Sequence, residues 1–238
     1  MTETTTPAPA ATPSASTRVS TRRLYRSAGI AALIAAGAYL FQPIVVFVVQ
    51  PPTEGAGGYP IASDLFALRA LVPAELAVFT TIGVATVVLA LAVFRLHAAR
   101  GVAPSLPSAV AVALGVIAGF GWMGAAAGTL TAYGLYATNI AEITDDTVIQ
   151  QAAIQAALLG NGMLSVPVLA MSGWFALLAT SGRRAGIVGW PLAVVCFAAT
   201  AIIGGPALIL LLPFGALALI PVFTVLGIAF LVKSRRSA

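Results

Sequence analysis

Charged side chains are scarce in this chain. They make up 8% of its 238 residues, against about 25% in a typical soluble domain. The 12 Lys and Arg and 7 Asp and Glu are too few to cover a water-facing surface at ordinary charge density. Because 60% of the residues are hydrophobic, most of the exterior must face lipid instead. The composition excludes an ordinary soluble fold and indicates an integral membrane protein.

Cysteine and histidine each occur only once. Cys196 cannot form a disulfide within the chain, and His97 cannot supply a histidine pair for haem or a multi-histidine metal site. We therefore expect no metal and no cofactor. The net charge of +5 does not indicate nucleic-acid binding, because a basic excess in a membrane protein normally reflects its orientation and anionic lipid headgroups.

Long intervals without charge set the number of membrane spans. A span needs roughly 20 residues at a rise of about 1.5 Å each. The intervals predict an all-α transmembrane bundle of six helices, with spans near 27–49, 74–94, 109–130, 158–180, 187–204 and 207–232. The last turn is placed at Gly204-Gly205-Pro206, although Pro213-Phe214-Gly215 offers similar turn chemistry. The fourth helix is expected to extend outside the membrane and to begin near Asp145-Asp146-Thr147.

Lys and Arg lie almost entirely on one side of this predicted bundle. Eleven of the 12 fall near the two termini or in the connections around 95–100 and 183–184, and only Arg69 falls on the other side. Positive charge accumulates in cytoplasmic loops. The sequence therefore predicts a multi-pass protein of the cytoplasmic membrane with both termini in the cytoplasm.

The ends and loops carry weaker signals. Residues 1–21 are rich in Thr, Ala, Pro and Ser, which predicts a disordered cytoplasmic tail ahead of a transmembrane domain over 22–238. In the largest outer loop, Ile61, Leu65 and Leu68 share one helical face. This spacing predicts a short helix on the outer membrane interface.

Small residues dominate the third predicted helix. Gly115, Gly119, Gly124 and Gly128 include two G-x-x-x-G spacings. Such spacing lets helix backbones approach closely in lipid, where the hydrophobic effect between helices is absent. We interpret these four glycines as helix-packing residues. Whether they meet helices of the same chain or of a homodimer partner is left open.

No ionisable residue lies inside a predicted span away from its ends. Glu75 follows Pro73 at a helix start, where an acid is favourable. His97 lies beside cationic residues and is expected at the surface. Ser172 has no histidine in the last helix to act as its base. We therefore predict no catalytic residues, and a protein that is not an enzyme.

Two uncharged polar residues remain. Gln42 precedes Pro43, and Asn161 has Pro167 nearby, so each combines a hydrogen-bonding side chain with a proline kink. Such residues either line a cavity or bond neighbouring helices together. Both alternatives stay open at this stage.

Several segments along the chain resemble one known group of proteins. These are Arg22-Arg23-Leu24-Tyr25-Arg26, Phe94-Arg95-Leu96, the crossing from Arg183 to Trp190, and Phe230-Leu231-Val232-Lys233. In order and spacing the chain resembles an uncharacterised family of small bacterial six-helix membrane proteins, known mainly as a domain of unknown function. The resemblance implies the architecture and no activity.

The sequence therefore favours a non-enzymatic accessory or regulatory subunit that acts through a membrane partner. The alternative is a carrier or binding protein for a neutral or lipophilic small molecule, prompted by Gln42, Asn161 and the prolines of the last hairpin.

Overall fold

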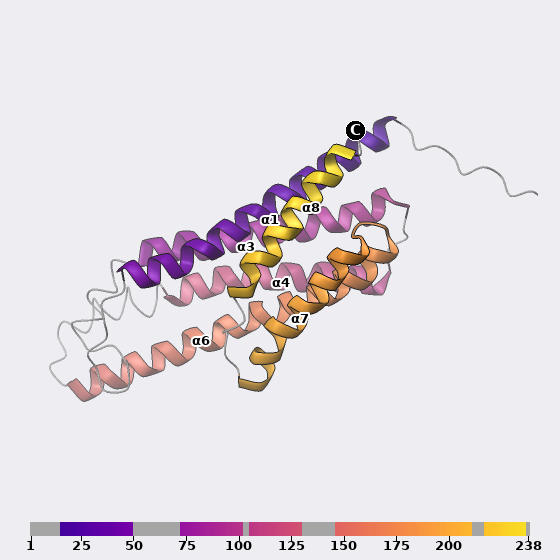
Figure 1. Ribbon diagram of the computed structural model, residues 1–238. Coiled ribbons are helices and arrows are strands. Elements are labelled where there is room, and N and C mark those ends of the chain that lie inside the picture. Colours follow the sequence, from indigo (N-terminus) through magenta and orange to yellow (C-terminus); the bar gives the residue numbers. More distant parts are fainter. Residues whose placement is uncertain (1–14, 50–71, 102–104, 130–145, 211–216, 237–238) are drawn as a thin grey trace, which may run out of the picture.

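The computed structural model describes residues 15–49, 72–101, 105–129, 146–210 and 217–236 (Figure 1). Within these ranges the chain is helical and contains no strand. The helices are α1 (Ala15–Val49), α3 (Val72–Ala99), α4 (Leu106–Thr129), α6 (Asp146–Leu177), α7 (Trp190–Leu210) and α8 (Leu219–Arg236), and a π-helical turn, η5 (Leu178–Gly182), continues α6. The prediction of an all-helical fold is confirmed.

Five of these helices are long and apolar enough to cross a membrane. The crossing segments are Ser20–Ile44, Pro73–Ala99, Leu106–Gly128, Gly162–Gly182 and Trp190–Leu208. Their outward faces carry large apolar side chains such as Ile34, Phe120 and Phe197, which are suited to lipid. By the length and composition of its helices, the chain is a multi-pass membrane protein.

The sixth helix differs from the other five. The last turn of α8 contains Lys233, Arg235 and Arg236, so its apolar part within the described chain is Leu219–Val232. At about 1.5 Å per residue this part measures about 21 Å, less than the roughly 30 Å of a bilayer core. A sixth span was predicted over 207–232, whereas the helix in the structure begins only at Leu219.

The turn before α8 was placed wrongly by the sequence. Instead of breaking at Gly204-Gly205-Pro206, α7 continues through Pro206 to Leu210. Proline in a membrane helix removes one backbone hydrogen bond, and neighbouring helices can compensate. Gly204 is buried where α7 packs on α6, since a Cβ there would collide with the Ser172 hydroxyl. The glycine therefore serves helix contact and not a turn.

The helix starts agree better with the sequence. As predicted, α6 begins at Asp146, ahead of its crossing segment. The expected tail over 1–21 is too long, because α1 already begins at Ala15. The helix expected around Ile61, Leu65 and Leu68 lies outside the described residues.

The helices follow one another around a shared core. α1 packs between α8 and α3, α4 packs between α3 and α6, and α7 packs on α6. α7 and α8 touch each other much less, so the ring of helices is weakest between them. The end of α8 lies beside the start of α1 (Figure 1).

Two pairs of glycines mark helix crossings at which backbone lies against backbone. A Cβ added to Gly29 of α1 would lie 3.0 Å from the Gly227 carbonyl oxygen of α8, and one added to Gly227 would lie 3.0 Å from the Gly29 oxygen. Likewise, a Cβ added to Gly119 of α4 would lie 2.7 Å from the Gly83 oxygen of α3. At both crossings backbone meets backbone, and a side chain would push the helices apart.

We expect Gly83→Ala to destabilise the bundle by roughly 1–3 kcal/mol, the usual effect of overpacking. The added methyl group would lie 2.8 Å from Met123 Cγ and against the Gly119 carbonyl. The control is Gly37→Ala, because a Cβ at Gly37 has nothing within 4 Å. Thermal unfolding of both variants in mild detergent checks this, and equal midpoints would contradict it.

Candidate functional site

The two polar residues singled out in the sequence belong to different helices. Gln42 is half-buried in α1. Asn161 belongs to α6, but its side chain lies outside what the structure describes. Gln42 is not among the described residues that line the groove below.

The four glycines interpreted as helix-packing residues all lie on α4 and have different surroundings. A Cβ on Gly115 would collide with Ala90 of α3, one on Gly119 would meet Gly83, and one on Gly128 would lie 2.8 Å from Met163 Sδ of α6. Gly124 differs, since a Cβ there would have nothing within 4 Å. Three of the four therefore stand at helix contacts within the chain, and Gly124 does not.

Aromatic side chains fill the centre of the bundle. Tyr39 lies edge-on to Trp122, with ring centroids 5.2 Å apart, and stacks on Phe223 at 5.7 Å. Phe79 stacks on Trp122, with ring centroids 5.6 Å apart. Phe175 then joins Phe223 at 5.7 Å. This cluster draws on five helices, α1, α3, α4, α6 and α8, and makes the core a packed interior.

Several polar atoms are buried in this core without a hydrogen bond. Within the described residues they are Tyr39 Oη, Thr86 Oγ1, Trp122 Nε1 and His97 Nε2. His97 is only 5% exposed, so its expected surface position is wrong. Its Nδ1 lies 2.9 Å from the Val93 carbonyl oxygen one turn earlier, which gives the ring a backbone partner inside α3.

Ser172 joins two helices. Its hydroxyl donates to the Thr200 carbonyl oxygen at 3.0 Å, and the Thr200 hydroxyl lies within hydrogen-bond distance of the Ser172 carbonyl at 3.2 Å. The Thr200 hydroxyl also lies 3.0 Å from the Cys196 carbonyl oxygen of its own helix, so the Ser172 hydroxyl supplies the clear bond from α6 to α7. Such bonds between helices in lipid each contribute about 0.6 to 2 kcal/mol.

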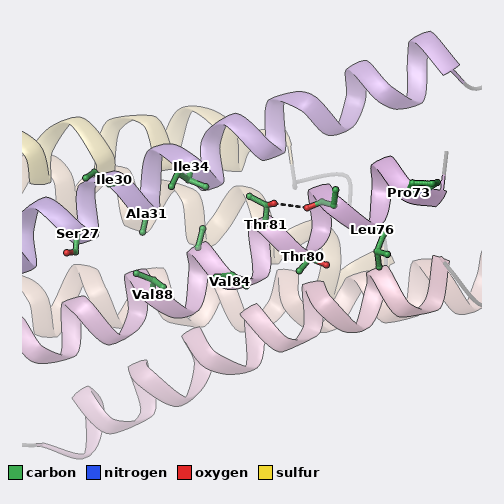
Figure 2. A pocket seen from close by; sticks show the side chains of 12 residues that line it. Ser27, Ile30, Ala31, Ile34, Pro73, Leu76, Thr80, Thr81, Val84 and Val88 are labelled. Atoms are coloured by element: carbon green, nitrogen blue, oxygen red, sulfur yellow. Dashed lines mark hydrogen bonds between the residues drawn. The ribbon is translucent and has the colours of Figure 1, made fainter. Parts of the chain in front are cut away.

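A groove with a volume of about 810 Å³ lies on the surface between α1 and α3. Ten of its side chains are labelled in Figure 2. The lining consists of Ser27, Ile30, Ala31, Ile34, Pro73, Leu76, Ala77, Thr80, Thr81, Val84, Ala85 and Val88. None of the twelve is charged, and half are Ala, Ser or Thr. Ile30, Ile34, Leu76, Val84 and Val88 are exposed, so the groove opens to the outside of the bundle.

The α3 side of the groove repeats at helical spacing. Its residues recur every three or four positions from Pro73 to Val88, a stripe about 22 Å long. The Thr81 hydroxyl donates to the Ala77 carbonyl oxygen at 2.7 Å, which removes its donor from the surface (Figure 2). Glycine spacing does not reveal this stripe in the sequence, because its small residues are Ala and Thr and none of its residues is glycine.

A second feature lies where α1 begins and α8 ends. Tyr25 of α1 is fully buried, and its hydroxyl accepts a hydrogen bond from Arg100 Nη2 at 3.0 Å. Lys233 of α8 donates to the carbonyl oxygens of Gly186 at 3.0 Å and Ile187 at 2.8 Å. The pKa of Lys233 is lowered mainly by burial of its ammonium group and, to a smaller extent, by the positive charge of Arg100. We call Tyr25, Arg100, Gly186 and Lys233 the basic clasp.

The basic clasp joins four separate parts of the chain. Arg100 directly follows α3, Gly186 lies in the connection before α7, and Lys233 lies in the last turn of α8. Gly186 has a φ of +68°, which favours glycine at the point where the connection bends. Nothing in the sequence pattern pairs these positions, because they are far apart along the chain.

Two tyrosines allow a direct test of buried hydroxyl groups. We expect Tyr39→Phe to leave stability unchanged or to raise it, because the hydroxyl of Tyr39 has no partner in the described chain and its burial is unfavourable. We expect Tyr25→Phe to lower stability by about 0.5–1.5 kcal/mol, since it removes the bond from Arg100. Denaturation curves of both variants check this, and a clear loss in Tyr39→Phe would show that its hydroxyl is bonded in the membrane.

Three comparisons place the chain against known proteins. No protein-family model, no curated protein and no solved structure matches it. The resemblance to the uncharacterised six-helix family therefore remains an expectation from sequence.

Proposed function

We propose that the protein is a non-enzymatic subunit whose α1–α3 groove receives a transmembrane helix of a partner membrane protein. The observation that carries this proposal is the composition of the groove. Half of its lining residues are Ala, Ser or Thr, the types that let helices approach each other in lipid. By contrast, the outer face of α7 presents large side chains, among them Val194, Phe197 and Ile202.

The shape of the groove supports a helix as its occupant. The α3 stripe of about 22 Å covers most of a bilayer core of about 30 Å. Ala31 and Ala85 are buried at 4% and 5% exposure on its α1 and α3 sides, and the larger side chains of Ile34 and Val84 are exposed. Because none of the described lining residues is charged, the matching face of the partner helix should be uncharged and rich in small residues.

A photo-crosslinking amino acid at Thr80 tests this proposal in cells at native expression level. We expect one discrete adduct with a second membrane protein, and no such adduct from the same amino acid at Ala201, an exposed position on α7. Ala77→Trp should fill the groove and abolish the adduct, whereas Ala201→Trp should not. Adducts with lipid alone, with residues of the same chain, or with a second copy would contradict a partner protein.

A small lipophilic ligand is the second candidate. The groove volume of about 810 Å³ lies within the range of about 300–1,000 Å³ usual for small-molecule sites. Its few hydroxyl groups would suit a neutral molecule. In the experiment above, this function predicts that the amino acid at position 80 crosslinks to a small molecule. The mass of the protein should then rise only by the mass of that compound, and no adduct with a second protein should form.

We also propose that both termini lie in the cytoplasm. The described basic residues lie at the ends of the helices that meet at the basic clasp, where α1 begins and α8 ends. This agrees with the positive-inside rule.

Reporter fusions test the orientation. An enzyme that is active only outside the cytoplasm should stay inactive when fused after Arg236, and a fluorescent protein fused at the same place should fluoresce. Activity of the first reporter would contradict a cytoplasmic end for α8.

A further inference from the structure

The two cations of the basic clasp approach the same groups. Arg100 Cζ and Lys233 Nζ each lie 5.8 Å from the centre of the Tyr25 ring. Both also border Gly186: its carbonyl oxygen accepts from Lys233, and a Cβ on it would lie 3.4 Å from Arg100 Nη1. Like charges held this close repel each other, and a bound anion relieves the repulsion.

Acidic residues stand elsewhere in the described chain. Glu75 lies in the first turn of α3 and Asp146 begins α6, whereas the basic clasp lies where α3 ends and beyond the end of α6. More cations flank the clasp, including Arg22 and Arg26, exposed on α1, and Arg183, whose guanidinium lies 4.3 Å from the Trp190 ring centre. This end of the bundle therefore attracts anions.

Arg100 has the donors that such an anion requires. A guanidinium has five N–H donors in a fixed fork, and one of them is used in the bond to Tyr25. Arg100 is exposed, so the remaining donors are accessible. The fork suits phosphate oxygens, while Lys233 adds a point charge beside it. Tyr25 and the Gly186 carbonyl hold the two side chains in place before any ligand binds.

Along the membrane normal, the basic clasp lies at the level expected for lipid headgroups. Arg100 directly follows the crossing segment that ends at Ala99, and Lys233 directly follows the apolar part of α8. These positions place both cations at the membrane–water boundary. Basic pockets between helices at that level bind the phosphates of anionic lipids.

We propose that Arg100 and Lys233 together bind a phosphate group, presented by an anionic phospholipid or free in water. The site is independent of the α1–α3 groove, since neither residue lines it.

The test is native mass spectrometry of the full-length protein in mild detergent with phosphatidylglycerol, phosphatidylcholine or inorganic phosphate. We expect phosphatidylglycerol to bind, and Arg100→Gln and Lys233→Gln each to weaken it at least about tenfold. Arg235→Gln is the matched control, because Arg235 is an exposed cation of the same helix turn, and it should bind like the native protein. Arg100→Lys keeps the charge without the fork and should lose less than Arg100→Gln.

The phosphatidylglycerol and inorganic phosphate arms distinguish the two sources of the phosphate group. Binding of phosphatidylglycerol that depends on Arg100 and Lys233 assigns the site to lipid, and equally dependent binding of inorganic phosphate alone assigns it to a soluble phosphate. Native affinity in both glutamine variants overturns the proposal, as does an equal loss in Arg235→Gln. Circular dichroism shows whether each variant folds. If Arg100→Gln does not fold, the lipid affinities of Lys233→Gln and Arg100→Lys decide whether the proposal holds.

Discussion

Backbone-to-backbone contact at glycines is the constraint on which the rest of this bundle depends. In lipid, burying apolar surface between helices gains little, so close packing must hold the helices together. Gly29 against Gly227 fixes α1 on α8, and Gly83 against Gly119 fixes α3 on α4. With these distances set, the rings of Tyr39, Trp122 and Phe223 meet in the centre. Larger residues at the crossings would separate the helices that supply the rings.

The same packing leaves the outer surface uneven. α1 uses Gly29 against α8 and α3 uses Gly83 against α4, so neither helix turns a glycine contact toward the other. Between α1 and α3 small side chains form the contact, and the groove opens there. The candidate binding surface is in this sense a product of how the neighbouring pairs are packed.

The sequence predicted the helices well because charge and hydropathy are local properties. The start of α6 at Asp146 could be predicted from its capping residues, and the charge-free intervals located the five crossing helices. The predicted position of the turn before α8 was wrong because Gly204 and Pro206, taken by themselves, are typical of the end of a helix. In the structure the glycine is explained by the packing of α7 on Ser172.

The candidate sites were harder to predict than the helices. Burial of His97 depends on which face of α3 turns inward, and the cationic residues around it suggested the opposite. The basic clasp depends on Tyr25, Arg100 and Lys233 meeting across the fold. Tertiary contacts of this kind leave no periodic signal, so a single sequence does not reveal them.

The crossing of α1 and α8 has a consequence for biosynthesis. The first described helix packs against the last, and Gly227 emerges from the ribosome long after Gly29 has entered the membrane. Until then, the face of α1 around Gly29 has no α8 to cover it. During synthesis this face is open to lipid, to insertion factors and to other nascent helices, and the bundle closes only when α8 arrives.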